Sequence, residues 1–327
     1  MGKEQSLQLK GLAILMMLWL HLFNTVERVG ECVTMVNYFN GKPLAYVLAR
    51  CSGMCVPIYL LISGYGMAKA RDLGSKATRR RLWRVYSRLW LVFVIFIPLG
   101  CWLRPEQYPG SWSTALLNLL GLDVSYNGEW WFLFPWCILM VSARWIVPFV
   151  QRHGAKVNAA VFLGLYLLCI GYKWPTYVLG ANVLSAQLQN LFLVMPAFYV
   201  GVCFGSHTDR WRRICPPHPL WLIVVLYAVR ALIGASLVNV LFAVPLILLF
   251  IQARLPHWAE ATLRFFGKYS VFIWLTHTFY AYYFFHDELY GLCYPLPMYV
   301  TLVVVSLLTA MLLYRLYNLL SNLLRRP

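Results

Sequence analysis

The chain has 327 residues, a formal net charge of +17, and a composition that is 61% hydrophobic but only 12% charged. Soluble domains carry about 25% charged residues, so an ordinary soluble protein is excluded. Several apolar runs of about 20 residues follow one another, and such runs predict membrane-spanning helices. The expected fold is all-α, a polytopic membrane helix bundle that forms a single domain over residues 1–327.

The apolar runs predict about ten transmembrane helices. They cover residues 7–26, 50–69, 83–103, 131–150, 157–173, 187–205, 218–234, 236–253, 266–286 and 296–319. A cytoplasmic N-terminus places 22 of the 28 lysines and arginines on the cytoplasmic side, as the positive-inside rule requires. Both termini are therefore expected in the cytoplasm. Because topology accounts for the positive charge, we expect no nucleic-acid partner.

The first apolar run contains two ionisable residues, Lys10 and His21. They are eleven positions apart, which places them within about 20° of one helix face and about 16 Å apart along the axis. Asn24 lies one turn beyond His21 on nearly the same stripe. Alone, Lys10 is explained as a snorkelling anchor and His21 as a packing residue. Together they favour a polar path through the membrane.

The second and third runs add small and basic residues. PIYLLISGYGM (57–67) contains Ser63 and Tyr65, and its small residues predict a close approach of two helices or of an acyl chain. RRRLWRVYSRLW (79–90) places Arg81, Arg84 and Arg88 at i, i+3 and i+7, on one helix face. Positive-inside topology explains the basic cluster, but it does not explain why the arginines continue into the apolar run.

Two later segments combine aromatic residues with a titratable one. EWWFLFPWCILMV (129–141) begins with Glu129, Trp130 and Trp131 at the predicted outer interface. Tryptophans there are typical of the aromatic belt, yet a carboxylate beside two indoles also suits sugar binding. FFGKYSVFIWLTH (265–277) ends in a second intramembrane histidine, His277. The remaining histidines lack metal-ligand spacing, so no metal site is expected.

These segments, in this order, resemble bacterial acyltransferase family 3, the membrane O-acyltransferases of glycans. Lys10 and His21 are similar to the family's Arg/Lys-x10-His signature, and Ser63, Gly64 and Tyr65 to its F-x-x-SG-[FY] element. Arg80, Arg81 and Arg84 match the family's basic segment, and EWWFLFPWCILMV (129–141) resembles its W-[FY]-L element. Gly267, Ser270 and His277 match its late helix. Two positions depart from the pattern, Ser87 for a usual proline and Trp274 for a usual tyrosine, and neither is expected to touch the chemistry. No fused extracytoplasmic domain is expected.

The resemblance implies a multi-pass protein of the bacterial inner membrane that moves an acetyl or other short acyl group from cytoplasmic acyl-CoA to a hydroxyl of an extracytoplasmic or lipid-linked glycan. Acyl-CoA is a co-substrate, and no bound cofactor is expected. The predicted catalytic residues are His21, Lys10 and His277, with His21 either a general base or an acylated nucleophile. The predicted donor site comprises Arg80, Arg81, Arg84, Arg88, Ser63 and Tyr65, and the predicted acceptor site comprises Glu129, Trp130, Trp131 and Asn24.

Two other functions use the same polar path. One is a transporter or flippase of a lipid-linked sugar, although the lack of a clear internal repeat weakens it. The other is an acyl-group exporter that depends on a partner transferase. The sequence leaves open the oligomeric state, the sugar, the hydroxyl and the acyl chain.

Overall fold

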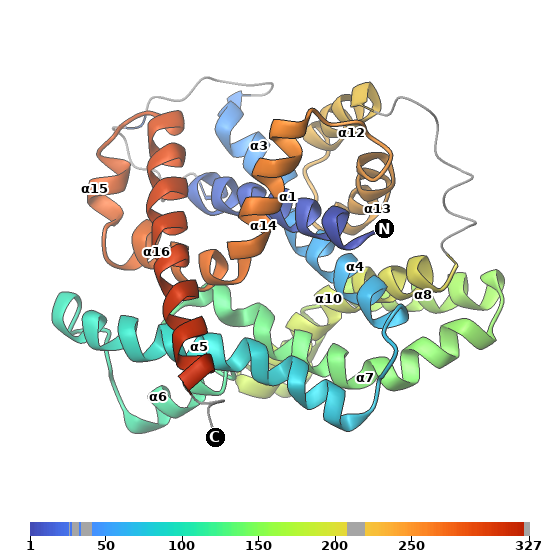
Figure 1. Ribbon diagram of the computed structural model, residues 1–327, viewed down its shortest axis with the longest axis horizontal. Helices are drawn as coiled ribbons and strands as arrows, with labels where there is room; N and C mark the ends of the chain where they lie inside the picture. The colour runs from blue at the N-terminus through green and yellow to red at the C-terminus, as the bar shows by residue number, and fades with distance from the viewer. Residues whose placement is uncertain (26, 28–32, 34–40, 208–219, 324–327) are drawn as a thin grey trace. The chain divides into compact units, whose positions relative to one another are not determined.

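The computed structural model describes residues 1–327 except 26, 28–32, 34–40, 208–219 and 324–327, and every element among the described residues is a helix (Figure 1). The elements are α1 (Lys3–Phe23), α3 (Leu44–Ser52), α4 (Cys55–Ala68), α5 (Ser75–Leu103), α6 (Trp112–Leu119), η2 (Gly128–Phe132), α7 (Leu133–Arg152), α8 (Ala155–Ile170), α9 (Trp174–Leu179), α10 (Val183–Ser206), α12 (Leu220–Leu232), α13 (Asn239–Phe250), α14 (His257–Thr278), η3 (Phe279–Tyr283), α15 (His286–Tyr290) and α16 (Pro295–Leu323). The predicted all-α class is confirmed.

Among the described residues, six helical segments are long and apolar enough to cross a membrane. They are Lys3–Phe23, Leu44–Ala68, Ser75–Leu103, Gly128–Arg152, Val183–Ser206 and Pro295–Leu323. Shorter apolar helices cover Ala155–Ile170, Leu220–Leu232 and Asn239–Phe250, at three of the other predicted spans. The first two residues of the predicted span 218–234, residues 218 and 219, lie outside the described residues. The count of ten and the cytoplasmic termini remain predictions.

Two predicted boundaries were wrong in ways that bear on function. α5 begins at Ser75 rather than at residue 83, so the arginine-rich segment is already helical. The predicted span 266–286 begins earlier, at His257, and its α-helical part ends at Thr278. A π-helical turn, Phe279–Tyr283, follows at once. Apolar periodicity reports where lipid contact begins and not where the backbone helix begins, since a helix continues into its polar flank.

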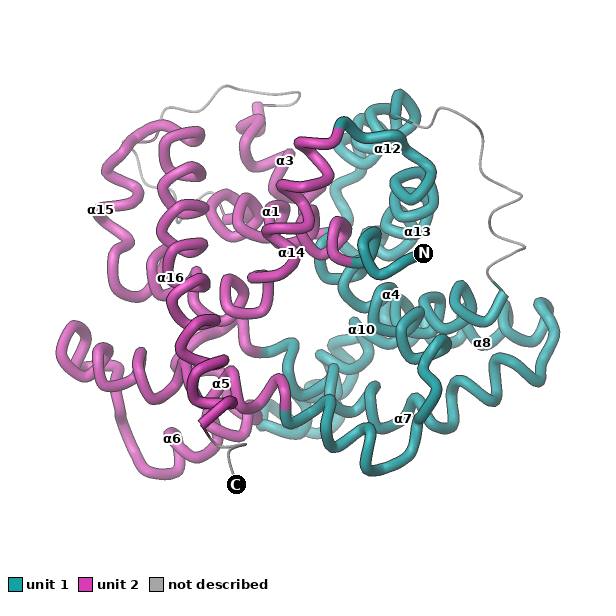
Figure 2. The backbone as a smooth tube through the Cα atoms, in the orientation of Figure 1, with its two compact units in different colours: residues 1–6, 54–83, 131–256 teal, residues 7–53, 84–130, 257–327 magenta. Residues whose placement is uncertain are grey.

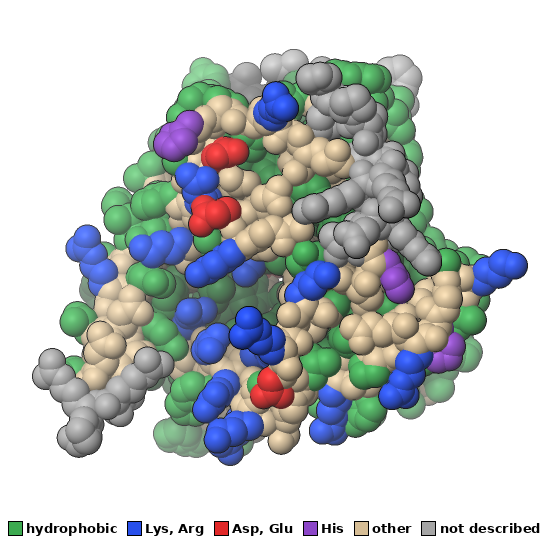
Figure 3. Space-filling view, turned by 45° about the vertical axis from the view of Figure 1, so that its right-hand side comes forward, with side chains coloured by type: hydrophobic (Ala, Val, Ile, Leu, Met, Phe, Trp, Pro, Cys, Tyr) green, Lys and Arg blue, Asp and Glu red, His purple; other side chains and the backbone are tan. Residues whose placement is uncertain are grey.

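The surface is apolar over long stretches of helix, as expected for contact with lipid. α16 exposes Val300, Val304, Leu308 and Leu312, with 67% of Leu312 exposed, so one face of this helix is a continuous apolar stripe. On the face shown in Figure 3, hydrophobic side chains lie beside many lysines and arginines and few acids.

The chain divides into two compact units, each built from separate parts of the sequence (Figure 2). One comprises residues 1–6, 54–83 and 131–256, and the other comprises residues 7–53, 84–130 and 257–327. α5 passes from the first unit into the second after Trp83.

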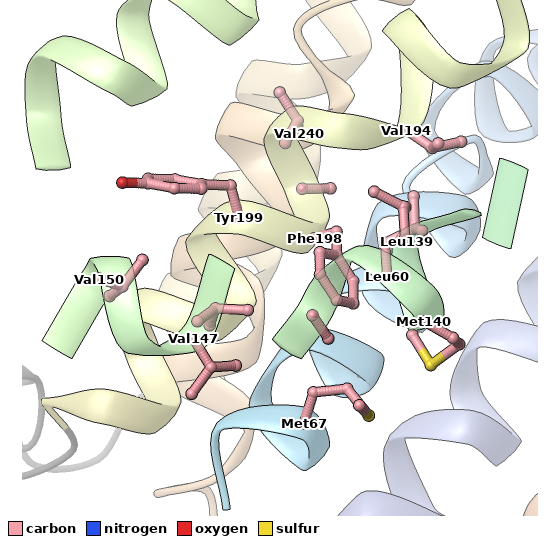
Figure 4. Close-up of a cluster of buried hydrophobic side chains, with 13 residues drawn as sticks. Leu60, Met67, Leu139, Met140, Val147, Val150, Val194, Phe198, Tyr199 and Val240 are labelled. Atoms are coloured by element: carbon pink, nitrogen blue, oxygen red, sulfur yellow. The ribbon is translucent and has the colours of Figure 1, made fainter. Parts of the chain in front are cut away.

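The core of the first unit lies where α4, α7 and α10 pack. Leu60, Leu139 and Phe198 lie together in this buried cluster (Figure 4). A Cβ added at Gly64 would stand 2.2 Å from the carbonyl oxygen of Phe198, and one added at Gly201 would stand 2.3 Å from that of Leu61. The predicted close helix approach at the small residues of 57–67 is therefore confirmed, with α10 as the partner helix.

The second unit contains a similar approach between α1 and α14. A Cβ at Gly11 would stand 1.9 Å from the carbonyl oxygen of Leu263, and a Cβ at Gly267 would stand 2.0 Å from that of Leu7. Neither contact leaves room for a methyl group, so the two backbones touch directly, as small residues permit between membrane helices.

Replacing Gly267 with alanine is expected to destabilise the protein by at least about 1–3 kcal/mol, because the clash is with backbone and no side chain can move aside. Gly164→Ala is the matched control, since this helical glycine has open space around its Cβ position. Thermal denaturation in detergent checks this. An unchanged midpoint for Gly267→Ala contradicts the close crossing.

Candidate active site

His21 stands in the last turn of α1, where helical carbonyl groups lack backbone partners. Two tyrosine hydroxyls donate to these carbonyls. Tyr282 Oη donates to the carbonyl oxygen of His21 at 2.5 Å, and Tyr290 Oη donates to that of Leu22 at 2.8 Å. The end of α1 is therefore held by the segment that follows α14, and the backbone of His21 is fixed.

The His21 imidazole is buried against that of His277. The distance from Nδ1 of His21 to Nε2 of His277 is 2.6 Å, and the rings are nearly parallel at 19°. His277 is fully buried, and its Nδ1 lies 3.0 Å from the carbonyl oxygens of both Ile273 and Trp274. The two histidines predicted as catalytic are thus brought into direct contact.

The other nitrogen of His21 faces a carboxylate. Glu129 Oε2 lies 3.1 Å from Nε2 of His21, in a contact that is largely shielded from solvent. Glu129 is carried by the 3₁₀ turn η2, its amide donates to Asn127 Oδ1 at 3.1 Å, and its carbonyl accepts from the Trp274 indole at 2.9 Å. Glu129, His21 and His277 form a continuous hydrogen-bonded row.

The turn that carries Glu129 is fastened to the end of α14 by buried side chains. Thr278 Oγ1 donates to Asn127 Oδ1 at 2.9 Å, and the Trp130 indole donates to the carbonyl oxygen of Leu275 at 3.1 Å. Tyr283 Oη accepts from the Gly128 amide at 2.8 Å. π-Helical turns such as Phe279–Tyr283 are frequent at functional sites.

Sequence reasoning missed Asn127, Trp274, Thr278 and Tyr282 as parts of this site. Trp274 lies closer to the candidate site than expected, because its indole donates to the backbone carbonyl oxygen of Glu129. The available signal was the buried polar pattern itself, since a threonine after His277 and an asparagine before Glu129 are costly in a membrane unless they bond.

Trp130 has a different role from the one predicted. It is completely buried, and its ring packs edge-on against Phe279. It fastens the turn of Glu129 and does not expose a ring face for a sugar, so the predicted stacking on the acceptor is not supported. Trp131 belongs to the other unit, where it packs against the core of α4, α7 and α10. Asn24 Oδ1 accepts from Thr25 at 3.2 Å, and its predicted acceptor contact stays a prediction.

The basic end of the predicted site is built around Arg88. Its guanidinium carbon lies 5.2 Å from the Tyr317 ring centre and 6.0 Å from that of Phe272. Its Nε is buried and has no hydrogen-bond partner among the described residues. Lys10, half-buried on α1, is close enough to Arg88 for their positive charges to repel. The Nε of Arg88, which has no partner among the described residues, lies near the positive charge of Lys10, and this combination favours an anionic ligand.

Of the other predicted donor residues, Arg84 precedes Arg88 by one turn of α5 and is close enough for their positive charges to repel. The others are described here by their own surroundings. Arg80 and Arg84 are exposed, and Arg81 donates to the carbonyl oxygen of Asp72 at 2.8 Å. Ser63 and Tyr65 belong to the first unit, where Ser63 accepts from the Trp136 indole at 3.3 Å and Tyr65 donates to the Met1 carbonyl oxygen at 3.0 Å. Their donor contacts stay predictions.

Comparison with known proteins identifies the family. The acyltransferase domain model of acyltransferase family 3 matches residues 7–315, nearly the whole chain. The chain belongs to this family of membrane acyltransferases. No curated protein and no solved structure shows a significant match. The resemblance seen in the ordered segments is therefore confirmed, and the row of Glu129, His21 and His277 is the candidate active site of a family 3 acyltransferase.

Trp274→Phe is expected to lower kcat for acyl transfer several-fold, because the Glu129 carbonyl loses its donor and the carboxylate is held less tightly against His21. The lost hydrogen bond is worth about 1 kcal/mol, so the folded state persists. Trp258→Phe is the matched control on the same helix, with 71% of its surface exposed. Steady-state rates of acyl transfer check this. Equal kcat values for the two variants contradict the positioning role of Trp274.

Proposed function

We propose that this protein is an O-acyltransferase that moves an acetyl or other short acyl group from acyl-CoA to a hydroxyl of an extracytoplasmic or lipid-linked glycan. The observation that carries the proposal is the environment of His21, a buried imidazole held between the carboxylate of Glu129 and the imidazole of His277. A sugar hydroxyl is a weak nucleophile, and a positioned histidine is the usual group that removes its proton. His21 is proposed as this general base.

Lys10 and Arg88 support a polyanionic donor. The CoA part of the donor carries phosphates, which guanidinium and ammonium groups bind by charge-assisted hydrogen bonds. α1 carries Lys10 eleven residues before His21, and eleven residues of helix span about 16 Å. In the proposed arrangement, the donor's anionic part meets Lys10 and Arg88 while its extended thioester arm reaches His21. The donor enters from the cytoplasmic side of an inner membrane.

Glu129 is also proposed to contact the acceptor, since carboxylates accept hydrogen bonds from sugar hydroxyls. The acceptor is proposed to approach from the outer side, where the predicted topology places the turn Gly128–Phe132. The alternatives are a transporter of a lipid-linked sugar and an exporter of acyl groups that acts with a partner transferase.

His21→Ala is expected to lower acyl transfer by about 100-fold or more, because it removes the general base. His286→Ala is the control, since His286 lies outside the row and pairs with Asp287. Purified protein, radiolabelled acetyl-CoA and a glycan acceptor provide the assay. Full transfer by His21→Ala contradicts the role of His21, whereas movement of lipid-linked sugar without acetyl-CoA turnover supports the transporter. Label bound to the protein without acceptor, and absent from His21→Ala, indicates an acyl-histidine instead of base catalysis.

Arg88→Met is expected to raise the KM for acyl-CoA about ten- to a hundred-fold with little change in kcat, because a charge-assisted contact is worth about 1.5–3 kcal/mol. Arg144→Met is the matched control, since that guanidinium also lies over an aromatic ring, 3.8 Å from the centre of Trp145, but on an exposed residue. Rates measured against donor concentration check this. Unchanged donor KM for Arg88→Met contradicts its place in the donor site.

A further inference from the structure

Three side chains in the candidate active site, the buried His21 and His277 and the partly buried Glu129, form a hydrogen-bonded row with a defined direction. One end of the row is a pair of backbone carbonyls, those of Ile273 and Trp274, each 3.0 Å from His277 Nδ1. The middle is the 2.6 Å contact between His277 Nε2 and His21 Nδ1. The other end is the 3.1 Å contact between His21 Nε2 and Glu129 Oε2.

The carbonyl end sets the tautomer of His277. Carbonyl oxygens only accept hydrogen bonds, so Nδ1 of His277 carries a hydrogen. The ring is completely buried, and an imidazolium there is costly, so a neutral ring is favoured. Its Nε2 then carries a lone pair and accepts the hydrogen bond from Nδ1 of His21.

This assignment sets the state of His21 in turn. With its hydrogen on Nδ1, a neutral His21 presents a lone pair at Nε2. That lone pair faces the carboxylate oxygen of Glu129, and two acceptors at 3.1 Å repel one another. A stable contact requires one additional proton between Nε2 and Oε2. Three hydrogen bonds need three protons, and the two neutral imidazoles supply only two.

We infer that the resting enzyme stores one exchangeable proton in the contact between His21 and Glu129, and that this proton is the one delivered to the leaving thiolate. The inference rests on the proposed function. The acceptor oxygen forms a bond to the acyl carbon while the bond from that carbon to sulfur breaks. The stored proton moves to the sulfur, and the hydroxyl proton takes its place at Nε2 of His21. The products are the ester and free CoA thiol, and the site returns to its resting state.

The roles of the two partners follow from this cycle. Glu129 is a catalytic residue that shares the transferred proton, in addition to any contact with the sugar. His277 is a positioning residue, because it acts only through His21 by fixing which nitrogen faces Glu129. The stored proton also explains a partly buried carboxylate in the membrane, since the row as a whole carries no net charge.

The proton itself is measurable without turnover. Full-length protein in lipid bilayers, labelled with ¹⁵N-histidine and ¹³C-glutamate, is examined by solid-state NMR at the pH of maximal activity. His21→Gln, His277→Gln and Glu129→Gln assign the three residues. The expected spectrum has His277 neutral with hydrogen on Nδ1, and either His21 protonated on both nitrogens or Glu129 as a carboxylic acid. An ionised Glu129 beside a neutral His21 with a bare Nε2 overturns the inference.

The kinetic arm uses Glu129→Gln, which keeps the shape of the side chain and its hydrogen bonding but cannot release a proton. A fall in kcat of about 10²- to 10⁴-fold with little change in the acceptor KM is expected. If Glu129 only binds the sugar, Glu129→Gln raises the acceptor KM and leaves kcat near the wild-type value. That result overturns the inference. Asp287→Asn is the matched control, because Asp287 makes a similar contact, 2.9 Å to His286, at an exposed position. It is expected to leave kcat unchanged.

The two arms separate this inference from the proposed function. If no acyl group is transferred to any acceptor, the proposed function fails and the NMR result still decides where the proton lies. If transfer proceeds while the spectra show an ionised Glu129 and a bare Nε2, only the stored proton is lost.

Discussion

α1 and α14 pass one another with almost nothing between their backbones, where Gly11 faces Leu263 and Gly267 faces Leu7. Each active-site histidine lies ten residues C-terminal to the glycine of its own helix. Two helices that touch at these glycines and meet again about 15 Å further on must run in the same direction. This agrees with the predicted topology, in which both spans run outward. A methyl group at either glycine forces the helices apart, and the contact between His21 and His277 depends on their separation.

The polar row is costly to bury, and this cost explains how thoroughly it is bonded. Partly satisfied polar networks are among the most destabilising features of a protein interior, whereas complete ones are rigid. Tyrosine hydroxyls cap the end of α1, backbone carbonyls hold His277, and an indole and an amide side chain hold the turn of Glu129. Most of these groups therefore position the three titratable side chains and do not take part in chemistry themselves.

Charge is distributed differently at the two ends of α1. Near its N-terminus, Lys10 and Arg88 lie close together, with Arg88 over aromatic rings and its Nε unused among the described residues. Near its C-terminus, two imidazoles and the carboxylate of Glu129 share their protons, so that in the inferred resting state these three groups carry no net charge. An anionic ligand is favoured at the first end and a proton transfer at the second, so one helix joins a binding function to a chemical one.

Composition, apolar run length and helical periodicity determined the all-helical class, the membrane setting and the pairing of Lys10 with His21 on one helix. These are local properties, set by the chain within a few turns, and a short ordered set of motifs was enough to reach the family. The sequence also pointed to His277, as a second catalytic histidine, and to Glu129, as an acceptor-binding residue. Only the tertiary structure decided that they form one row, that Trp274 and Asn127 hold it, and that Trp130 is buried beneath it. Those contacts join residues more than one hundred positions apart, and their geometry depends on how closely two helices pack, which no local pattern encodes.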